Sequence, residues 1–197
     1  MPPNNQNNPR SRQPAAATPG SGGVTPSGGG PRGDARTIEL LNLVLKNELT
    51  SINQYFLHSR MLADWGISEL AKVEYDESID EMKHADRLIR RILFLGGLPN
   101  LQYLDRLMLG ENVEEIIAGD LALEDKAHGE LRQAIAYAES VQDFGSRELY
   151  VEILKSEEEH IDYLRTQQKL IAQIGIADYI QVQTQANKAS ALNAPGD

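Results

Sequence analysis

Hydrophobic residues recur at alternating three- and four-residue steps along four long stretches of the chain, which is the spacing of an apolar helix face. The pattern predicts helices from about residue 36 to 65, from 68 to the Gly96-Gly97 pair, from 113 to 142 and from 146 to 174, with a short fifth helix over 178–185. No stretch shows the strict alternation of a strand. The sequence therefore predicts an all-α protein.

The connections between these helices predict how they are arranged. A short turn near Gly66 joins the first pair, a tight turn at 143–145 joins the second pair, and residues 98–111 link the pairs without a helical period. Two helical hairpins joined by a long link form a four-helix bundle with one crossover. Ser68 and Asn112 are suited to cap the second and third helices, with Glu115 at a capping-box position.

Ionisable side chains interrupt the apolar stripe of every long helix. In the second helix, for example, the stripe runs through Val73 and Glu77 before it reaches two further polar residues. Across the four helices, the main interruptions are Glu48, Glu81, His84, Glu124, Glu157 and His160. No lysine or arginine shares the stripes beside them, so their burial is unfavourable unless they take up protons or surround cations.

The type and spacing of these six residues indicate metal binding. Two Glu-x-x-His motifs, 81–84 and 157–160, each place a carboxylate and an imidazole one turn apart on one helix face. With Glu48 and Glu124 they supply four carboxylates and two imidazoles, which is too many for one tetrahedral zinc and suits two iron or manganese ions. The sequence predicts a dinuclear site in which two carboxylates bridge the metals.

Composition divides the chain into three parts. Residues 1–35 are rich in proline and glycine and have almost no large apolar side chains, so they predict a flexible tail. Residues 36–186 form one predicted domain, and 187–197 a flexible C-terminal segment.

The formal net charge of the whole chain is −10, and the N-terminal tail is weakly basic, so the domain is more acidic than the chain as a whole. Such an acidic domain is a poor nucleic-acid binder and attracts cations. The chain has no cysteine, which excludes thiolate metal sites and disulfides. No apolar run reaches the roughly 20 residues of a membrane span, and no signal-peptide pattern is present. These features predict a cytoplasmic protein that is not inserted in a membrane.

Four segments resemble bacterioferritins: "NELTSINQYFLHSRM", "EYDESIDEMKHADRLIRRILFLGGLPNLQ", "DLALE" and "EEEHIDYL", within a region from about residue 33 to 185. The resemblance implies the ferritin-like fold and a hollow shell of 24 subunits built from dimers. It also implies that the six polar residues are ferroxidase ligands for two iron ions per subunit. Glu81 and Glu157 would bridge the ions, and each histidine would bind one of them.

The resemblance further implies iron storage and detoxification. The ferroxidase would oxidise Fe(II) to Fe(III) with O2 or H2O2, and a ferric mineral would form inside the shell. Met82 follows Glu81 and projects about 100° around the helix from it, so it leaves the core. In bacterioferritins such a methionine ligates haem b shared by two subunits, and a small electron-donor protein serves iron release. Without the resemblance, Met82 is more simply a packing residue at a dimer contact.

Four more positions match or alter the bacterioferritin pattern. Tyr55 matches a tyrosine near the di-iron site, and Tyr163 replaces a frequent tryptophan. Both are candidate electron donors with a core aromatic as the alternative, and for Tyr163 the two interpretations fit equally well. Asp76 replaces a frequent histidine that binds iron on the inner surface of the shell. Asp80 matches that pattern, so the two residues are candidate inner-surface ligands.

Two other functions stay open from the sequence. One is a di-iron or di-manganese enzyme that acts on peroxide or another substrate, and the other is a structural haem-binding shell with a vestigial metal site. The first lacks an additional cysteine cluster or substrate domain, and the second does not explain why all six ligands are present. Whether other subunit types join the assembly, and what the N-terminal tail does, are also open.

Overall fold

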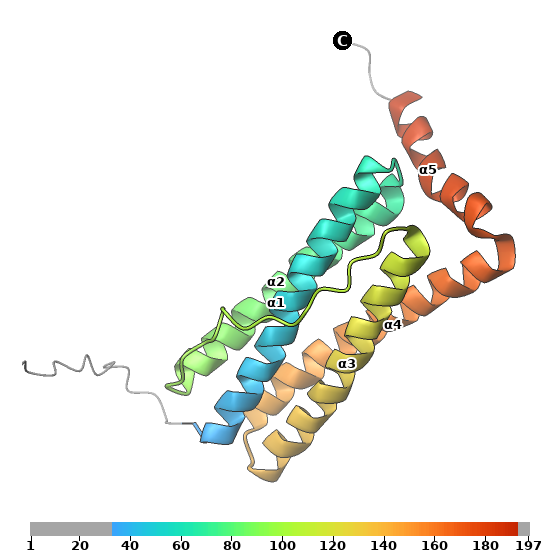
Figure 1. Cartoon of the computed structure of the whole chain (residues 1–197). Coiled ribbons are helices and arrows are strands. Elements are labelled where there is room, and N and C mark those ends of the chain that lie inside the picture. The colour runs from blue at the N-terminus through green and yellow to red at the C-terminus, as the bar shows by residue number, and fades with distance from the viewer. Residues whose placement is uncertain (1–32, 193–197) are drawn as a thin grey trace, which may run out of the picture.

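The computed structural model describes residues 33–192 and contains a bundle of four long helices (Figure 1). The helices are α1 (Ala35–Asp64), α2 (Ser68–Phe94), α3 (Val113–Ser140), α4 (Phe144–Ile174) and α5 (Ile176–Leu192). The helices α1 and α2 form one hairpin and α3 and α4 the other, with a long crossover between them. No strand occurs in this part of the chain. The predicted all-α bundle with one crossover and a C-terminal fifth helix is confirmed.

The helix starts follow the local polar side chains, with two differences from prediction. Asn112 caps α3 as expected, because its side chain accepts the N–H of Glu115 at 2.9 Å. Ser68 is not a cap: it is the first residue of α2, and Ile67 before it provides no side-chain hydrogen bond. The carboxylate of Glu115 accepts a hydrogen bond from the N–H of Glu111 at 2.9 Å. In a capping box it would instead accept the N–H of the cap residue, Asn112.

The fourth and fifth helices both begin earlier than predicted. Asp143 caps α4 by accepting the N–H of Ser146 at 3.0 Å, so the helix starts at Phe144 rather than at Ser146. Helix α5 is also longer than the predicted 178–185, since it extends to Leu192 into the segment expected to be flexible. Residues 193–197 and residues 1–32 of the predicted N-terminal tail lie outside the described residues.

Helix α5 lies against α2 and α4 at the end of the bundle nearest the α1–α2 turn (Figure 1). Its Tyr179 is buried, and the Tyr179 hydroxyl donates a hydrogen bond to Gln167 of α4 at 2.9 Å. The fifth helix therefore closes one end of the hydrophobic core with a satisfied polar group.

The hydrophobic core consists of two apolar clusters at opposite ends of the bundle. The cluster nearest the α3–α4 turn includes the fully buried Leu41, Leu45, Leu88, Ile92, Leu131 and Ile153. The cluster nearest the α1–α2 turn includes Leu62, Leu70, Ile116, Ile117 and Leu164. Each buried side chain of this size contributes about 1.5–3 kcal/mol to folding. The two clusters hold the polar layer between them in place from both ends.

The first turns of α2 are rotated relative to the predicted stripe. Val73 and Glu77 were expected to face the core, but they are only half-buried, whereas Glu74 and Ser78 are fully buried. The predicted orientation of this part of α2 is wrong because a buried polar residue adds nothing to the hydrophobic pattern from which the buried face was predicted. The apolar pattern alone could not distinguish Glu74 from Glu77.

The crossover runs in extended form along α1 (Figure 1). An extended segment outside a sheet leaves its backbone N–H groups without partners, and here side chains on one face of α1 accept them. The pairs are Asn100 N–H to Asn42 at 2.7 Å, Asp105 N–H to Thr50 at 3.1 Å, Met108 N–H to Gln54 at 2.8 Å and Gly110 N–H to His58 at 3.2 Å. These four hydrogen bonds fix the path of the crossover without a helix.

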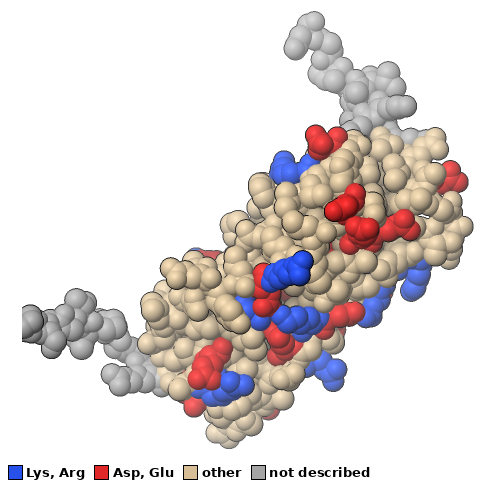
Figure 2. Space-filling view, in the orientation of Figure 1, with Lys and Arg blue, Asp and Glu red and all other residues tan. Residues whose placement is uncertain are grey.

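Acidic and basic side chains are interspersed over the face seen in Figure 2, and many of them pair with each other. None of the helices in residues 33–192 has a stretch apolar enough, over a sufficient length, to cross a membrane.

We expect Gln54→Met to loosen the crossover while keeping the size of the side chain. The substitution removes the acceptor of the Met108 N–H, and an unmet buried group of this kind costs about 1–3 kcal/mol. Hydrogen exchange across residues 105–110 should accelerate about 10- to 100-fold. Asn53→Met is the matched control, because Asn53 is exposed and bonds only within α1. Unchanged exchange in the Gln54 variant would contradict this account of the crossover.

Candidate metal centre

A layer of polar side chains crosses the bundle between the two apolar clusters. Every helix of the bundle contributes to it, and the members are the predicted six: Glu48 from α1, Glu81 and His84 from α2, Glu124 from α3, and Glu157 and His160 from α4. Five of the six are buried, and the side chain of His84 is 11% exposed. The structure thus brings together all the residues that interrupted the apolar stripes.

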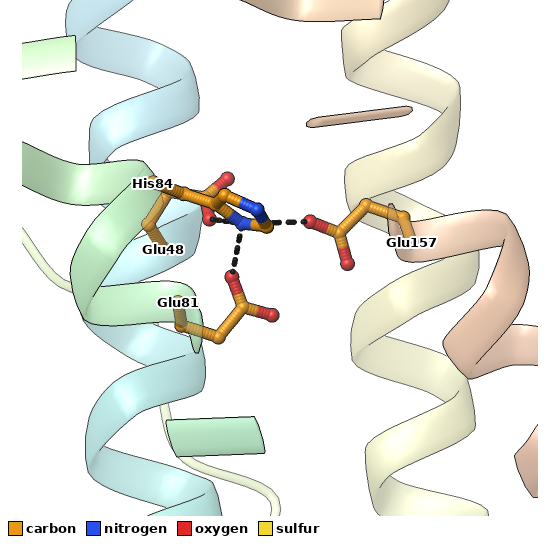
Figure 3. Close-up of side chains that lie close together, drawn as sticks. All are labelled: Glu48, Glu81, His84 and Glu157. Carbon is orange, nitrogen blue, oxygen red and sulfur yellow. Dashed lines mark hydrogen bonds and ion pairs between the residues drawn. The ribbon is translucent and has the colours of Figure 1, made fainter. Parts of the chain in front are cut away.

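One half of the layer is centred on the His84 ring (Figure 3). Its Nδ1 lies 3.2 Å from Oε2 of Glu48, 3.2 Å from Oε2 of Glu81 and 3.7 Å from Oε1 of Glu157. One potential ligand atom from each of these four residues lies within 4.8 Å of the others. Carboxylates from three helices therefore approach Nδ1 of His84. Those of Glu48 and Glu81 come from the α1–α2 hairpin, and that of Glu157 comes from the α3–α4 hairpin.

The other half of the layer is centred on the His160 ring. Its Nδ1 lies 3.4 Å from Oε1 of Glu124 and 3.5 Å from Oε1 of Glu77. The Tyr55 hydroxyl donates a hydrogen bond to Glu124, and the Tyr55 ring meets the His160 ring edge-on at 5.2 Å between centroids. Glu77 was expected on the core-facing stripe but not as a ligand, so its proximity to His160 is new.

Burial shifts the proton affinity of the carboxyl groups in this layer. It raises the pKa of Glu48 to about 7 and the pKa of Glu81 and Glu157 well above the ordinary range. The charges of Glu81 and Glu124 raise the pKa of Glu157 further, as expected for a residue between the two halves. Burial lowers the pKa of His160, but the nearby Glu124 and Glu77 outweigh it and raise this pKa to about 9. Without a cation, the layer therefore retains protons.

Several polar atoms of the layer lack any hydrogen-bond partner. They are Oε1 of Glu81, Oε2 of Glu124, Oε2 of Glu157 and both ring nitrogens of His160. Buried polar atoms are normally paired, because each unpaired one costs about 1–3 kcal/mol. Free carboxylate oxygens and imidazole nitrogens are the ligand types that bind iron and manganese. The residues present therefore fit a pair of such ions.

Three other predicted site residues lie on the outer surface of α2. Met82 is 52% exposed and points away from the polar layer, consistent with its place one residue after Glu81. Asp76 and Asp80 are both exposed or half-exposed, and each pairs with a lysine of the same helix, Lys72 and Lys83 respectively. None of the three belongs to the polar layer within one chain.

The aromatic residues expected near the site lie on both sides of His160. Tyr55 is fully buried, and Tyr163 stacks on the His160 ring with 6.3 Å between centroids. Burial raises the pKa of Tyr163 above its ordinary value. The Tyr163 phenol is therefore neutral over the physiological pH range.

A second buried polar cluster was not predicted as a site. His58, Glu74 and Asp120 each place a potential ligand atom within 4.8 Å of the others. Asp120 lies one turn before Glu124 on the same face of α3. This spacing was the only feature of the sequence that pointed to the second cluster. His58 carried no motif, and Glu74 lay outside the predicted stripe.

Comparison with known proteins agrees with the fold. Residues 38–174 match the family model described as Ferritin-like domain. The chain is 45% identical to a bacterioferritin of Brucella melitensis biotype 1 over 77% of this chain and 94% of the relative. It is 46% identical to bacterioferritins of Rhodobacter capsulatus, over 73% of this chain and 89% of the relative, and of Mycobacterium leprae, over 73% and 91%. The chain therefore belongs to the bacterioferritins, within the ferritin-like family.

Proposed function

We propose that this protein stores iron and oxidises Fe(II) at the polar layer of its own bundle. Membership of the bacterioferritins supports iron storage. The observation that carries the oxidation step is the set of buried carboxylate and imidazole atoms without hydrogen-bond partners, contributed by α2, α3 and α4 to one layer of the bundle. Storage would take the form of a ferric mineral within a shell of 24 copies of the chain.

We assign the ligands by their position in the layer. Glu48 and His84 would hold one iron, and Glu124 and His160 the other. Glu81 and Glu157 would bridge the two, which is supported by the reach of Glu157 towards His84 at 3.7 Å and by its electrostatic coupling to both Glu81 and Glu124. Four carboxylates balance two divalent cations, so the charge of the loaded layer would be close to neutral.

An iron pair at this position would supply two electrons to O2 or H2O2 as both ions pass from Fe(II) to Fe(III). The chain's own residues prepare that step by exchanging protons for metal. Burial raises the pKa of Glu81 and Glu157 well above its ordinary value, so these groups hold protons more tightly in the metal-free layer and would release them on becoming ligands. Tyr55 orients Glu124 through its hydroxyl, and Tyr55 and Tyr163 flank His160 as candidate electron donors.

The surface around Met82 supports a haem site between two subunits. Tyr75 lies two turns before Met82 on α2 and contacts Phe56 of α1, with 6.4 Å between ring centroids. Phe56, Tyr75 and Met82 are all exposed, and the Arg60 guanidinium lies over both rings. Exposed apolar patches of this kind mark binding surfaces. Met82 of each of two chains would ligate haem b, which would carry electrons from a small donor protein for iron release.

The inner-surface iron site at Asp76 and Asp80 and the cytoplasmic location stay predictions from the sequence. The two aspartates are four residues apart on one face of α2, which suits a shared ion. Their lysine partners compete with a cation for the same oxygens.

The double substitution Glu81→Ala and Glu157→Ala tests the proposed ferroxidase. Loss of both bridging carboxylates should slow Fe(II) oxidation by on the order of 100-fold or more, measured by the absorbance of Fe(III) after mixing with O2 or H2O2. The matched control replaces Glu69 and Glu159, exposed glutamates of the same two helices, by alanine. Rapid oxidation that persists in the first variant, at the rate of the control, would show that oxidation occurs elsewhere.

Metal removal should make the stability of the protein depend on pH. The pKa of Glu48 is about 7 in the folded chain against 4.5 ordinarily, so the folded state binds the extra proton between these values. This stabilisation is fully present below pH 4.5 and is lost as the pH rises through about 7. Glu48 alone accounts for about 3 kcal/mol. The melting temperature of the metal-free protein should therefore fall over this range.

Two variations of the same melting experiment check the cause. Added Mn²⁺ should reverse the fall, because a bound cation replaces the protons. Glu48→Gln should weaken the pH dependence, whereas Glu69→Gln on the surface of α2 should not. If the metal-free protein becomes more stable as the pH rises over this range, these carboxyl groups are not buried without a compensating positive charge, and this account is wrong.

Met82→Leu tests the haem site. Leucine fills a similar volume but has no sulfur ligand, so the variant should lose the low-spin haem absorption band after haem is added. Met108→Leu is the control, since Met108 is also exposed but lies in the crossover. An unaltered low-spin band in the Met82 variant would assign haem to other ligands.

A further inference from the structure

The buried cluster of His58, Glu74 and Asp120 lies between α1, α2 and α3, close to the proposed iron pair. Asp120 is one helical turn before Glu124, and Glu74 is one turn before Glu77, which approaches His160. All three side chains of the cluster are fully buried. One potential ligand atom from each lies within 4.8 Å of the others.

Two residues of the cluster, His58 and Asp120, help to hold the crossover. His58 does so directly, and Asp120 does so through its contacts with His58 and with Gln54, which lies outside the cluster. His58 and Gln54 accept backbone N–H groups of the crossover through Nε2 and Oε1. The same two side chains also reach Asp120: Gln54 Nε2 donates to Oδ1 of Asp120 at 2.8 Å, and His58 Nδ1 lies 2.9 Å from the same oxygen. Asp120 therefore orients Gln54 and His58, two of the four residues of α1 that hold the crossover.

The hydrogen bonds of His58 fix its protonation. Since Nε2 accepts the N–H of Gly110 at 3.2 Å, it carries no proton. The ring proton is therefore on Nδ1, which donates to Asp120, and the imidazole is neutral. A neutral imidazole provides no positive charge to offset the Asp120 carboxylate. Because Nδ1 carries the proton, His58 positions Asp120 and is not itself free to bind a metal.

Glu74 has no role in holding the crossover. Both of its carboxyl oxygens are buried without a hydrogen-bond partner, although they lie in the same cluster as Asp120. Among the side chains that the structure describes, those of residues 33–184, no lysine or arginine forms an ion pair with either residue. Two facing carboxyl groups without a counter-charge are highly unfavourable in a core. Burial and the charge of Asp120 raise the pKa of Glu74 well above its ordinary value.

We propose that Glu74 and Asp120 bind one divalent cation, separate from the proposed iron pair. The ligands would be the two oxygens of Glu74 and Oδ2 of Asp120, whose one hydrogen-bond contact is the longer one to His58, at 3.2 Å. Oδ1 of Asp120 is already engaged by Gln54 and His58. A site of carboxylate oxygens alone suits hard cations such as Mn²⁺, Fe²⁺ or Mg²⁺.

The position of this site gives it a link to the iron pair. Glu77 lies one turn after Glu74 on α2 and within 3.5 Å of His160, so carboxyl groups follow one another along α2 from the second site to the first. A cation at Glu74 and Asp120 would be the third in the bundle core. The inference rests on Glu74 and Asp120 and does not require that the protein oxidises iron.

Anomalous diffraction from crystals of the full chain grown with a slight molar excess of Mn²⁺ at neutral pH tests the site. Manganese suits oxygen ligands and does not oxidise readily under these conditions. We expect a peak between Glu74 and Asp120 in addition to the peaks at the six-residue layer. Titration calorimetry should give one manganese ion per chain fewer in Glu74→Gln than in the wild type. Glu69→Gln on the surface of the same helix should bind as many ions as the wild type.

Each outcome decides the proposal. A wild-type map with manganese at the six-residue layer and none at Glu74 and Asp120 overturns it, because the two carboxyl groups then share only a proton. A third peak that survives in Glu74→Gln overturns it as well. Asp120→Asn provides a second variant that keeps acceptors for Gln54 and His58, and it should also lose the third ion. Loss of peaks at the six-residue layer alone would count against the proposed ferroxidase and not against this site.

Discussion

The constraint on which the rest of this structure depends is the burial of four carboxyl groups in one layer without a lysine or arginine among them. Glu48, Glu81, Glu124 and Glu157 come from four different helices, so no local rearrangement relieves their repulsion. In the metal-free chain, protons reduce the charge, and the apolar clusters on both sides supply the stability that keeps the layer closed. The fold therefore contains an unfavourable arrangement that bound cations would relieve, which is the usual physical basis of a metal site.

The same reasoning explains why much of the site could be predicted from the sequence. A glutamate or histidine within an apolar stripe is visible as an interruption, and two Glu-x-x-His motifs at matching heights leave few arrangements for the six side chains. The crossover was predicted as a long link because it has no helical period. Its path along α1 could not be predicted, since that depends on backbone N–H groups meeting Thr50, Gln54 and His58 across the sequence.

The residues that were missed share a physical cause. Glu74 and Glu77 are both compatible with a core position, and the hydrophobic pattern of α2 is too sparse near its start to choose between them. The rotation of this part of α2 is set by packing of Leu70 and Ala71 against the second apolar cluster. Single-residue shifts of this kind decide which carboxylate enters the core. The prediction that Ser68 caps α2 was also wrong. The helix begins at Ser68 itself, and the Ser68 hydroxyl forms no hydrogen bond.

Glu81 and Met82 are consecutive residues, yet one faces the interior of the bundle and the other faces outward. A single peptide unit of α2 thus joins the inside of a subunit to the surface where a neighbouring subunit would sit. If both side chains hold redox-active groups, the shortest covalent route between those groups is intramolecular and has a fixed length. Any twist of α2 about its axis would then alter the surroundings of both groups together, so that electron exchange between them and the geometry of each would be mechanically linked.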